Sequence, residues 1–418
     1  MDELAYDRLR LRQWMAGEAT GFSRRDLLKL TAAAGAGAAV SASVGQQAQA
    51  ATQAQAATQA QAAAGPIVKP LPPELFTVLG TNAEMRWSAM AGQGYLVPID
   101  RFFVRNHTST PIIDAATWRL RLSGAGLRGG PAEFTYDDLR RLPAETITAA
   151  VECAGNGRSY FTTQQGETVS GTAWKLGAVG VARWRGVRLS TVLHRAGLGR
   201  NAVDLMPTGL DPNYVTGGVD LGPVRRPLPL RKALQDVLIA YEMNGEPLPA
   251  DHGFPVRLIV PGWIGIASIK WLGSIEVADT PLFSPWNTQF YRLFGPGFPT
   301  EGQPFDRQVI KSAFELDPGA QVPAGQKVKL RGRSWSAAGP IAHVDVSTDG
   351  GQSWRRARRV GSGSAWQRWE LPWRPTAGEH QLLARATDVR GNTQPDVATY
   401  NTLGYLFDAV VEHPVVAG

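Results

Sequence analysis

Apolar and polar residues alternate along the C-terminal part of the chain. Val328–Arg333 and His343–Ser347 both show this alternation, which is typical of half-buried β-strands. Asp349-Gly350-Gly351 predicts a hairpin turn after the second run, because glycine accepts the positive φ that such turns require. Large apolar side chains for a core come from Trp354, Trp366, Trp369 and Trp373. Several short strands at regular spacing predict an immunoglobulin-like β-sandwich over residues 302–418.

Strand and helix patterns interleave over residues 66–301. Phe102–Val104 reads as a short buried strand, and Thr146–Val151 is a β-rich run that ends near the single cysteine. Tyr136–Leu142 and Leu189–Ala196 have the pattern of short helices. The order shows no regular βαβ spacing, so it favours a mixed α+β domain over a doubly wound sheet.

The amino-terminal residues 1–50 have the pattern of a targeting segment. Ser23–Lys29 contains a twin arginine, and the weakly apolar run Leu30–Val44 follows it. This run is too short and too rich in alanine for a comfortable membrane span, so it predicts a twin-arginine signal peptide and export of the folded protein. Residues 51–65 repeat a Thr-Gln-Ala-Gln-Ala-Ala unit and predict a flexible linker. The cleavage point, and retention as a membrane anchor, stay open.

Composition agrees with a soluble two-domain enzyme. The 418 residues are 43% hydrophobic and 19% charged, as in globular proteins. One cysteine excludes an internal disulfide. The formal charge of +7 is a mild excess that would steer small anions or an acidic protein partner. No basic block with interleaved aromatic residues is present, which argues against a nucleic-acid partner.

The cysteine stands in the stretch Val151–Tyr160, VECAGNGRSY. A thiolate suits a soft or high-valent metal, and glycines allow a bulky ligand to approach the backbone closely. Arg158 nearby would lower the thiol pKa or hold an anion. Taken alone, the stretch is more typical of a buried structural cysteine beside a glycine turn.

The segment Glu152–Arg158, ECAGNGR, closely resembles the CAGN-x-R segment of the sulfite oxidase family, the eukaryotic-type molybdenum enzymes. Four further segments carry the similarity: Phe102–His107, Tyr241–Gly265, Ile269–Val277 and Asp345–Trp354. The resemblance covers nearly everything after residue 70. It implies a molybdopterin domain over 66–301, a dimerisation domain over 302–418 and assembly as a homodimer.

The resemblance implies that Cys153 ligates the molybdenum of a molybdenum-molybdopterin cofactor. The pterin and its phosphate would be held by Phe103, Val104, Arg105, Asn106, His107, Asp211, His252, Arg257, Ser268, Ile269 and Lys270. From the residues alone, a lone histidine such as His252 is usually structural. No local metal-ligand spacing involves any of the six histidines.

The resemblance places four side chains around the open metal positions, namely Arg105, Arg158, Trp174 and Tyr291. Two guanidiniums can hold an oxyanion through paired N–H donors, and the indole and phenol add neutral donors. Ordinary core packing also accounts for most aromatic residues. Three departures from the animal enzymes, at Gly157, at Gly265–Ser268 and at Phe290, make the pocket rim less charged and put the substrate's identity in doubt.

The chain contains no C-x-x-C-H haem-attachment motif, so electrons are expected to pass to a separate acceptor such as cytochrome c. The leading hypothesis is an exported enzyme that oxidises sulfite or a related sulfur oxyanion to sulfate. One alternative uses the same cofactor reductively on nitrate or an S-oxide. Another is an exported binding protein without a metal.

Overall fold

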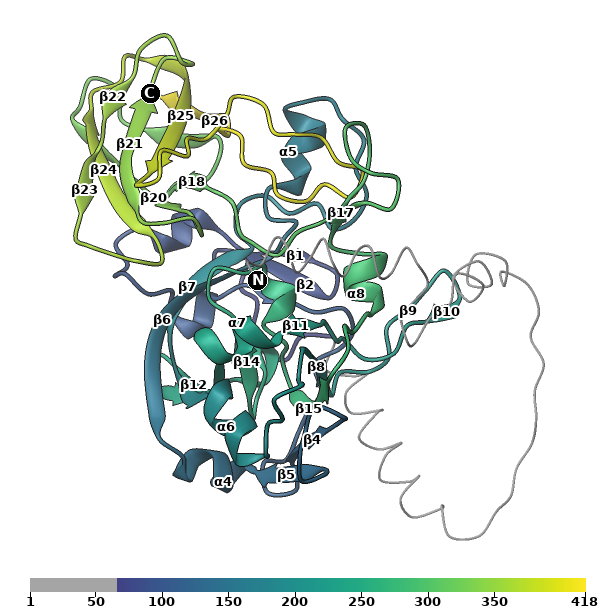
Figure 1. The fold of residues 1–418 in the computed structure, drawn as a ribbon. Coiled ribbons are helices and arrows are strands. Elements are labelled where there is room, and N and C mark those ends of the chain that lie inside the picture. Colours follow the sequence, from purple (N-terminus) through teal and green to yellow (C-terminus); the bar gives the residue numbers. More distant parts are fainter. Residues whose placement is uncertain (1–65) are drawn as a thin grey trace.

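The computed structural model describes residues 66–418. Figure 1 shows a larger body that combines sheets and short helices, and a smaller β-rich body built from the C-terminal residues. The predicted signal peptide and linker lie in residues 1–65 and so fall outside the described residues. Among the described residues, no helix combines the length and the apolar character needed to cross a membrane.

Two sheets form the framework of the larger body. The first contains, in spatial order, β11 (Leu228–Pro229), β8 (Asp204–Gly209), β15 (Leu272–Ala278), β4 (Arg119–Ser123) and β5 (Ala132–Thr135). The second contains β13 (Glu246–Pro247), β12 (Leu238–Met243), β7 (Val179–Arg188) and β6 (Ala144–Glu152), with β14 (Arg257–Ile259) also paired to β12. Strand β6 runs antiparallel to β7 and ends one residue before the cysteine.

Short helices and small sheets complete this body. The α-helices are α4 (Tyr136–Arg141), α5 (Arg158–Thr163), α6 (Leu189–Arg195), α7 (Leu230–Gln235) and α8 (Pro285–Thr288). The 3-10 turns are η1 (Trp87–Met90), η2 (Ile99–Arg101), η3 (Ala250–His252) and η4 (Gly265–Ala267). Three small sheets are also present among the described residues. One contains β1 (Phe76–Leu79), β2 (Asn82–Met85) and β3 (Val104–Arg105). The second pairs β9 (Val215–Thr216) with β10 (Val219–Asp220), and the third pairs β16 (Arg292–Leu293) with β17 (Gln303–Pro304).

The smaller body contains two sheets around a shared apolar core. One sheet has β18 (Lys311–Phe314), β20 (Val328–Trp335), β24 (Gln367–Trp373) and β23 (Arg358–Val360). The other has β19 (Ala320–Val322), β26 (His413–Ala417), β25 (Gly378–Asp388), β21 (Ile341–Ser347) and β22 (Arg355–Arg356). Leu330 and Trp369 from the first sheet pack with Val344 and Leu382 from the second. The predicted alternating runs lie within β20 and β21.

Local patterns located several of these elements. The two predicted helices match α4 and α6 to within one residue at each end. Helix α4 begins with a capping box between Thr135 and Asp138, which satisfies backbone N–H groups at the helix start. The strand predicted at Phe102–Val104 is wrong in position, because the turn η2 extends to the hydrogen bond from Phe102 N–H to Ile99 O and pairing begins only at Val104.

Buried aromatic and charged side chains join the two bodies. Trp87 stacks on Trp335 with ring centres 5.9 Å apart. Arg333, fully buried in β20, pairs with Glu315 at 2.8 Å. Its remaining nitrogens donate to the carbonyl oxygens of Gly94 and Tyr95 in the larger body, at 3.0 and 3.1 Å. One continuous apolar cluster therefore spans both bodies, and they share part of their core.

A segment that we call the wrapping segment, Val389–Glu412, leaves β25, passes beside α5 and returns to β26 (Figure 1). Phe407 contacts Phe161 of α5 edge to face, with ring centres 5.0 Å apart. The side-chain amides of Gln164 and Gln165 donate to the carbonyl oxygens of Val410 and Ala398. These contacts along the wrapping segment hold the smaller body against the larger one.

The Arg333–Glu315 pair gives a prediction about stability. Replacing Arg333 by methionine leaves the Glu315 carboxylate buried without its cation, and breaking such a pair costs about 3–5 kcal/mol. We expect that decrease in the free energy of unfolding of Arg333→Met, measured by denaturant titration. Arg331→Met, on the exposed face of the same strand, is the control. Equal stability of the two variants would show that the pair contributes nothing.

A cleft between the two bodies contains a buried carboxyl group. Glu84 of β2 and Tyr160 of α5 line it from one side, and Phe314 and His413 line it from the other. Glu84 is only 3% exposed, and one carboxylate oxygen accepts the backbone N–H of Lys175 at 2.9 Å. Burial raises the pKa of Glu84 from 4.5 to about 7, although the hydrogen bonds from the backbone oppose the shift.

This raised pKa predicts a pH dependence of stability. The folded protein holds the Glu84 proton more tightly than the unfolded chain does. The contribution of this group to the free energy of unfolding is therefore complete below pH 4.5 and is lost as the pH rises through about 7. The shift corresponds to about 3 kcal/mol. We expect Glu84→Gln to remove this decrease relative to wild type, in denaturation curves collected from pH 4 to 8. Glu74→Gln, at an exposed position, should leave the wild-type profile intact.

Candidate active site

Most of the residues predicted for the site meet in one cavity of the larger body. Cys153 lines this cavity together with eleven others from the predicted set: Phe103, Arg105, Asn106, His107, Asp211, His252, Arg257, Ser268, Ile269, Lys270 and Tyr291. They come from four separate parts of the chain, near residues 105, 153, 211 and 250–291. Val104, Arg158 and Trp174 are not among the lining residues.

The cysteine lies on a short loop between β6 and α5. Its backbone N–H donates to Ala178 O at 2.9 Å, and its carbonyl accepts the N–H of Asn156 at 2.9 Å. Gly157 has a φ of 94°, which glycine adopts without strain, and it precedes the first residue of α5. Cys153 is 7% exposed, at the cavity wall. The loop thus presents one sulfur to the cavity from a backbone that is hydrogen-bonded on both sides.

Three cationic side chains surround the cavity. Arg105 lines the cavity together with Cys153, and its Nη1 donates to Asn106 O at 2.5 Å. Arg257 donates to the carbonyl oxygens of His252 and Ser268 at 3.1 and 3.0 Å, and burial lowers its pKa to about 9. Lys270 donates to Asp251 O at 2.8 Å and to the side chain of Asn106. Burial, followed by repulsion from Arg257, holds the pKa of Lys270 well below its ordinary value.

These cations have no carboxylate within ion-pairing distance in the part of the chain that the structure describes. Asp251 lines the same cavity, but its oxygens accept the backbone N–H groups of Val68 and Lys69 and the hydroxyl of Thr110. The imidazole Nε2 of His252 is buried without a hydrogen-bond partner. An anionic ligand with polar ring atoms would supply both an ion-pair partner for these cations and a hydrogen-bond partner for His252 Nε2.

His107 is held neutral beside Arg105. Its Nε2 lies 3.0 Å from Nη2 of Arg105 and 3.1 Å from the indole Nε1 of Trp286. Both neighbours are donors, so Nε2 must accept and the ring proton must be on Nδ1. Burial and the charge of Arg105 lower the pKa of His107 well below its ordinary value. The histidine therefore orients Arg105 without adding to the positive charge of the cavity.

Arg158 and Trp174 lie behind the cavity wall. The Nε and Nη1 atoms of Arg158 donate to the carbonyl oxygens of Leu403 and Thr172, each at 2.9 Å. A Cβ on Gly155 would lie 2.6 Å from this guanidinium, so glycine at 155 makes room for it. Trp174 is fully buried and meets Phe103 edge to face. The substrate contact predicted for Arg158 and Trp174 stays a prediction. The observed partners of Arg158 are backbone carbonyl oxygens, whereas the indole Nε1 of Trp174 is buried without a hydrogen-bond partner.

Tyr405 is a neighbour of the site that the sequence did not indicate. It belongs to the wrapping segment and stacks on Tyr291 with ring centres 5.2 Å apart. The guanidinium of Arg158 lies 5.2 Å from the centre of the Tyr405 ring. Burial raises the pKa values of Tyr405 and Tyr291, so both phenols stay protonated at neutral pH. No local motif marks Tyr405, because its partner Tyr291 is far away along the chain.

The architecture also limits how a metal can bind. No cluster of three or more histidine, cysteine, aspartate or glutamate side chains suited to a metal ion occurs among residues 66–418. A metal in this cavity would therefore take the Cys153 sulfur as its protein ligand, and the remaining ligands would have to come from a cofactor. The lone thiol, the unpaired cations and the free Nε2 of His252 fit an anionic pterin that carries its own metal ligands.

Comparisons with known proteins agree with this fit. The model of the oxidoreductase molybdopterin binding domain matches residues 107–286, and that of the Mo-co oxidoreductase dimerisation domain matches residues 308–412. Mitochondrial sulfite oxidase of Homo sapiens is 37% identical over 342 residues, which are 76% of this chain and 61% of that protein. Sulfite oxidase of Gallus gallus is 36% identical over 337 residues, 75% of this chain and 71% of that protein.

One solved structure matches across both bodies. The sulfane dehydrogenase SoxCD from Paracoccus pantotrophus superposes with a TM-score of 0.70 at 28% sequence identity, over 82% of this chain and 85% of that chain. The present chain spans about three fifths of the length of the mammalian relatives that it matches.

Replacing one of the cavity cations should weaken cofactor binding without lowering the stability of the cofactor-free protein. Lys270→Met removes a desolvated charge, so we expect the cofactor-free protein to unfold no more easily than wild type, although two hydrogen bonds are lost. Molybdenum affinity should fall about 10–100-fold, as for other residues that support a metal site indirectly. Lys327→Met, at an exposed position, is the control for both measurements. Full molybdenum content in Lys270→Met after extended dialysis would contradict the assignment.

Proposed function

Because the chain belongs to the sulfite oxidase family of molybdopterin oxidoreductases, we propose that it oxidises a small sulfur oxyanion, with sulfite as the first candidate. The observation that carries the proposal is the single thiol of Cys153 beside buried cations that form no ion pair with a carboxylate among the described residues. The net reaction takes an oxygen atom from water, converts sulfite to sulfate and releases two protons and two electrons.

The cavity residues divide into those that hold the cofactor and those that face the substrate. His252, Arg257 and Lys270 would bind the pterin and its phosphate through the free Nε2 and the two cations. Cys153 would ligate the molybdenum. When bound, this cofactor supplies the oxygen-atom transfer and accepts the electrons, and the protein orients it and tunes its surroundings.

Arg105 and Tyr291 are the residues that we assign to the substrate. Burial opposes the charge on Arg105, but the pKa of the guanidinium still lies above its ordinary value, so it stays charged. Its paired N–H donors suit an oxyanion, and the neutral phenol of Tyr291 adds one more donor. His107 fixes the orientation of this guanidinium, and the indole of Trp286 holds the ring of His107. The stacked rings of Tyr291 and Tyr405 exclude water from the same wall.

The wider setting of the reaction completes the proposal. The twin-arginine pattern supports export of the folded, cofactor-loaded protein to a periplasmic or other extracytoplasmic compartment. The match to a dimerisation domain over residues 308–412 supports a homodimer. We assign the role of electron acceptor to a separate protein such as cytochrome c, which the mild positive charge of the chain would attract if its docking face is acidic.

The proposal is tested on protein produced in a host that makes the cofactor. We expect about one molybdenum per chain by elemental analysis, and reduction of cytochrome c that depends on sulfite. Cys153→Ser should lose the metal and show only the background rate, while Arg105→Met should keep the metal and lose about 10²–10³-fold in kcat/KM.

Two outcomes would refute this function. Wild-type protein without molybdenum would indicate an exported binding protein. A molybdenum-loaded protein that is inactive with sulfite, but oxidises a reduced viologen dye with nitrate or an S-oxide, would indicate the reductive direction.

A further inference from the structure

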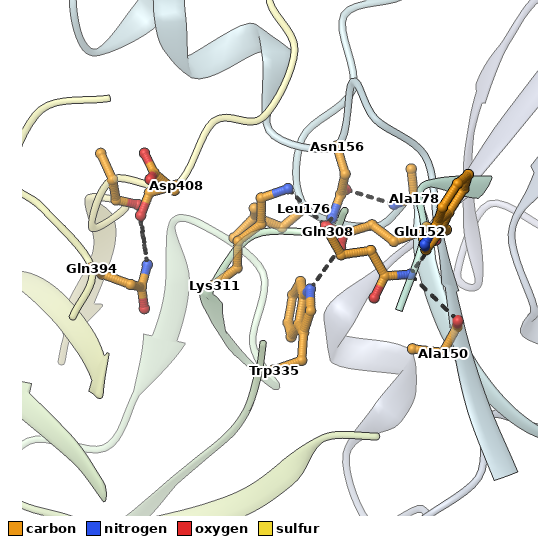
Figure 2. Close-up of polar contacts among 12 residues, drawn as sticks. Ala150, Glu152, Asn156, Leu176, Ala178, Gln308, Lys311, Trp335, Gln394 and Asp408 are labelled. Carbon is orange, nitrogen blue, oxygen red and sulfur yellow. Dashed lines mark hydrogen bonds and ion pairs between the residues drawn. The ribbon is translucent and has the colours of Figure 1, made fainter. Parts of the chain in front are cut away.

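The residue before Cys153 is a buried carboxylate with three side-chain donors. Glu152 is 1% exposed. Its Oε1 accepts Nζ of Lys311 at 2.7 Å and Nδ2 of Asn156 at 3.0 Å, and its Oε2 accepts the indole Nε1 of Trp335 at 3.0 Å (Figure 2). Both carboxylate oxygens are therefore bound, and the side chain has one orientation that satisfies all three donors.

Two of these donors come from the smaller body. Lys311 is the first residue of β18, and Trp335 is the last residue of β20. Lys311 is 2% exposed and Trp335 is 1% exposed, so water does not compete for either contact. Gln308, which precedes β18, donates to the carbonyl oxygen of Ala150 in β6 at 3.4 Å (Figure 2) and to that of Trp263 at 3.0 Å. The start of the smaller body thus contacts the strand that leads to the cysteine.

The third donor connects the carboxylate to the cysteine loop itself. Asn156 is fully buried, and its Oδ1 accepts the backbone N–H of Ala178 at 3.0 Å (Figure 2). The carbonyl of the same Ala178 accepts the N–H of Cys153. Glu152 and Asn156 therefore enclose Cys153 on both sides, and each has a partner outside the loop. The loop also contains Gly155 and Gly157, which would leave its backbone free to move without these contacts.

A buried ion pair adds little to stability compared with a well-packed apolar pair of the same volume, because both charges are desolvated. Stabilisation of the contact between the two bodies is therefore a poor explanation for the Glu152–Lys311 pair. Arg333, which pairs with Glu315 inside the smaller body, already connects the two bodies through its hydrogen bonds to carbonyl groups of the larger body. What distinguishes Lys311 is that its contact ends one residue from the thiol.

We propose that Lys311 is a positioning residue for Cys153: through Glu152 and Asn156, the smaller body fixes the direction in which the thiol faces the cavity. This inference rests on the proposed function for the role of the thiol as a metal ligand. It assigns to the smaller body a task in the active site of its own chain, beyond dimerisation. Arg333 serves as the matched case, a buried cation of the same body that contacts the larger body away from the cysteine loop.

The experiment compares full-length, cofactor-loaded Lys311→Met and Arg333→Met with wild type. Lys311→Met is expected to shift the visible absorption of the metal–thiolate centre and to lower kcat for sulfite about 10–100-fold with little change in KM, as for other supporting residues of metal sites. Arg333→Met is expected to unfold more easily but to keep the wild-type spectrum and kcat. A wild-type spectrum and kcat in Lys311→Met, or equal changes in both variants, would overturn the inference.

A double variant covers the case in which Lys311→Met does not fold. Glu152→Gln combined with Lys311→Met removes both charges, so neither ion is left buried without its partner, and the amide oxygen introduced at position 152 can still accept one of the two donors, Asn156 Nδ2 or Trp335 Nε1. We expect it to fold and to show the shifted spectrum, because the loop has lost its tether to β18. A fully wild-type spectrum and kcat in this double variant would overturn the inference.

A measurement on cofactor-free protein separates this inference from the proposed function. The rate at which iodoacetamide modifies Cys153 should rise several-fold in the Glu152→Gln, Lys311→Met double variant and stay at the wild-type value in Arg333→Met. An unchanged rate in the double variant would count against positioning. If wild-type protein binds no molybdenum, the proposed function fails, while the thiol measurement still decides whether Lys311 positions the loop.

Discussion

Buried positive charge that forms no ion pair among residues 66–418 is the constraint on which the site depends. Arg105, Arg257 and Lys270 lie around one cavity, and desolvation weakens the protonated state of the latter two. Such an arrangement costs folding free energy unless a ligand compensates it. The fold tolerates the cost because backbone carbonyl oxygens accept hydrogen bonds from Arg257 and Lys270. A site of this kind is preorganised for an anion in the ligand-free protein.

The two bodies contribute to this site in different ways. The larger body supplies the cations and the thiol, and each comes from the end of a strand or from a turn that the sheets hold in place. The smaller body supplies contacts from behind: Lys311 and Trp335 to the residue before the thiol, and Tyr405 to the wall beside Tyr291. The shared apolar core makes these contacts possible, because a mobile junction would not hold atoms at hydrogen-bond distance.

Local sequence patterns predicted several of the elements, but they did not identify the members of the cavity. Helices α4 and α6, the strand before the cysteine and the paired sheets of the smaller body all follow from periodicity and turn residues. The cavity members were identified through resemblance to a family. The patterns did not give the partners of Arg158, since its guanidinium binds the carbonyl of Leu403, 245 residues away. Tyr405 and Lys311 were missed for the same reason: packing between distant segments brings them to the site, and no local signal records it.

The wrapping segment has a consequence for the order of biosynthesis. Leu406 donates its N–H to Ala154 O, next to the cysteine, and Phe407 packs within 3.1 Å of the position where a Cβ on Gly157 would stand. The ribosome must therefore translate beyond residue 407 before the thiol's surroundings can close. A nascent chain of which only the larger body has emerged lacks this wall, so the surroundings of the thiol stay incomplete until the wrapping segment has been synthesised and has packed.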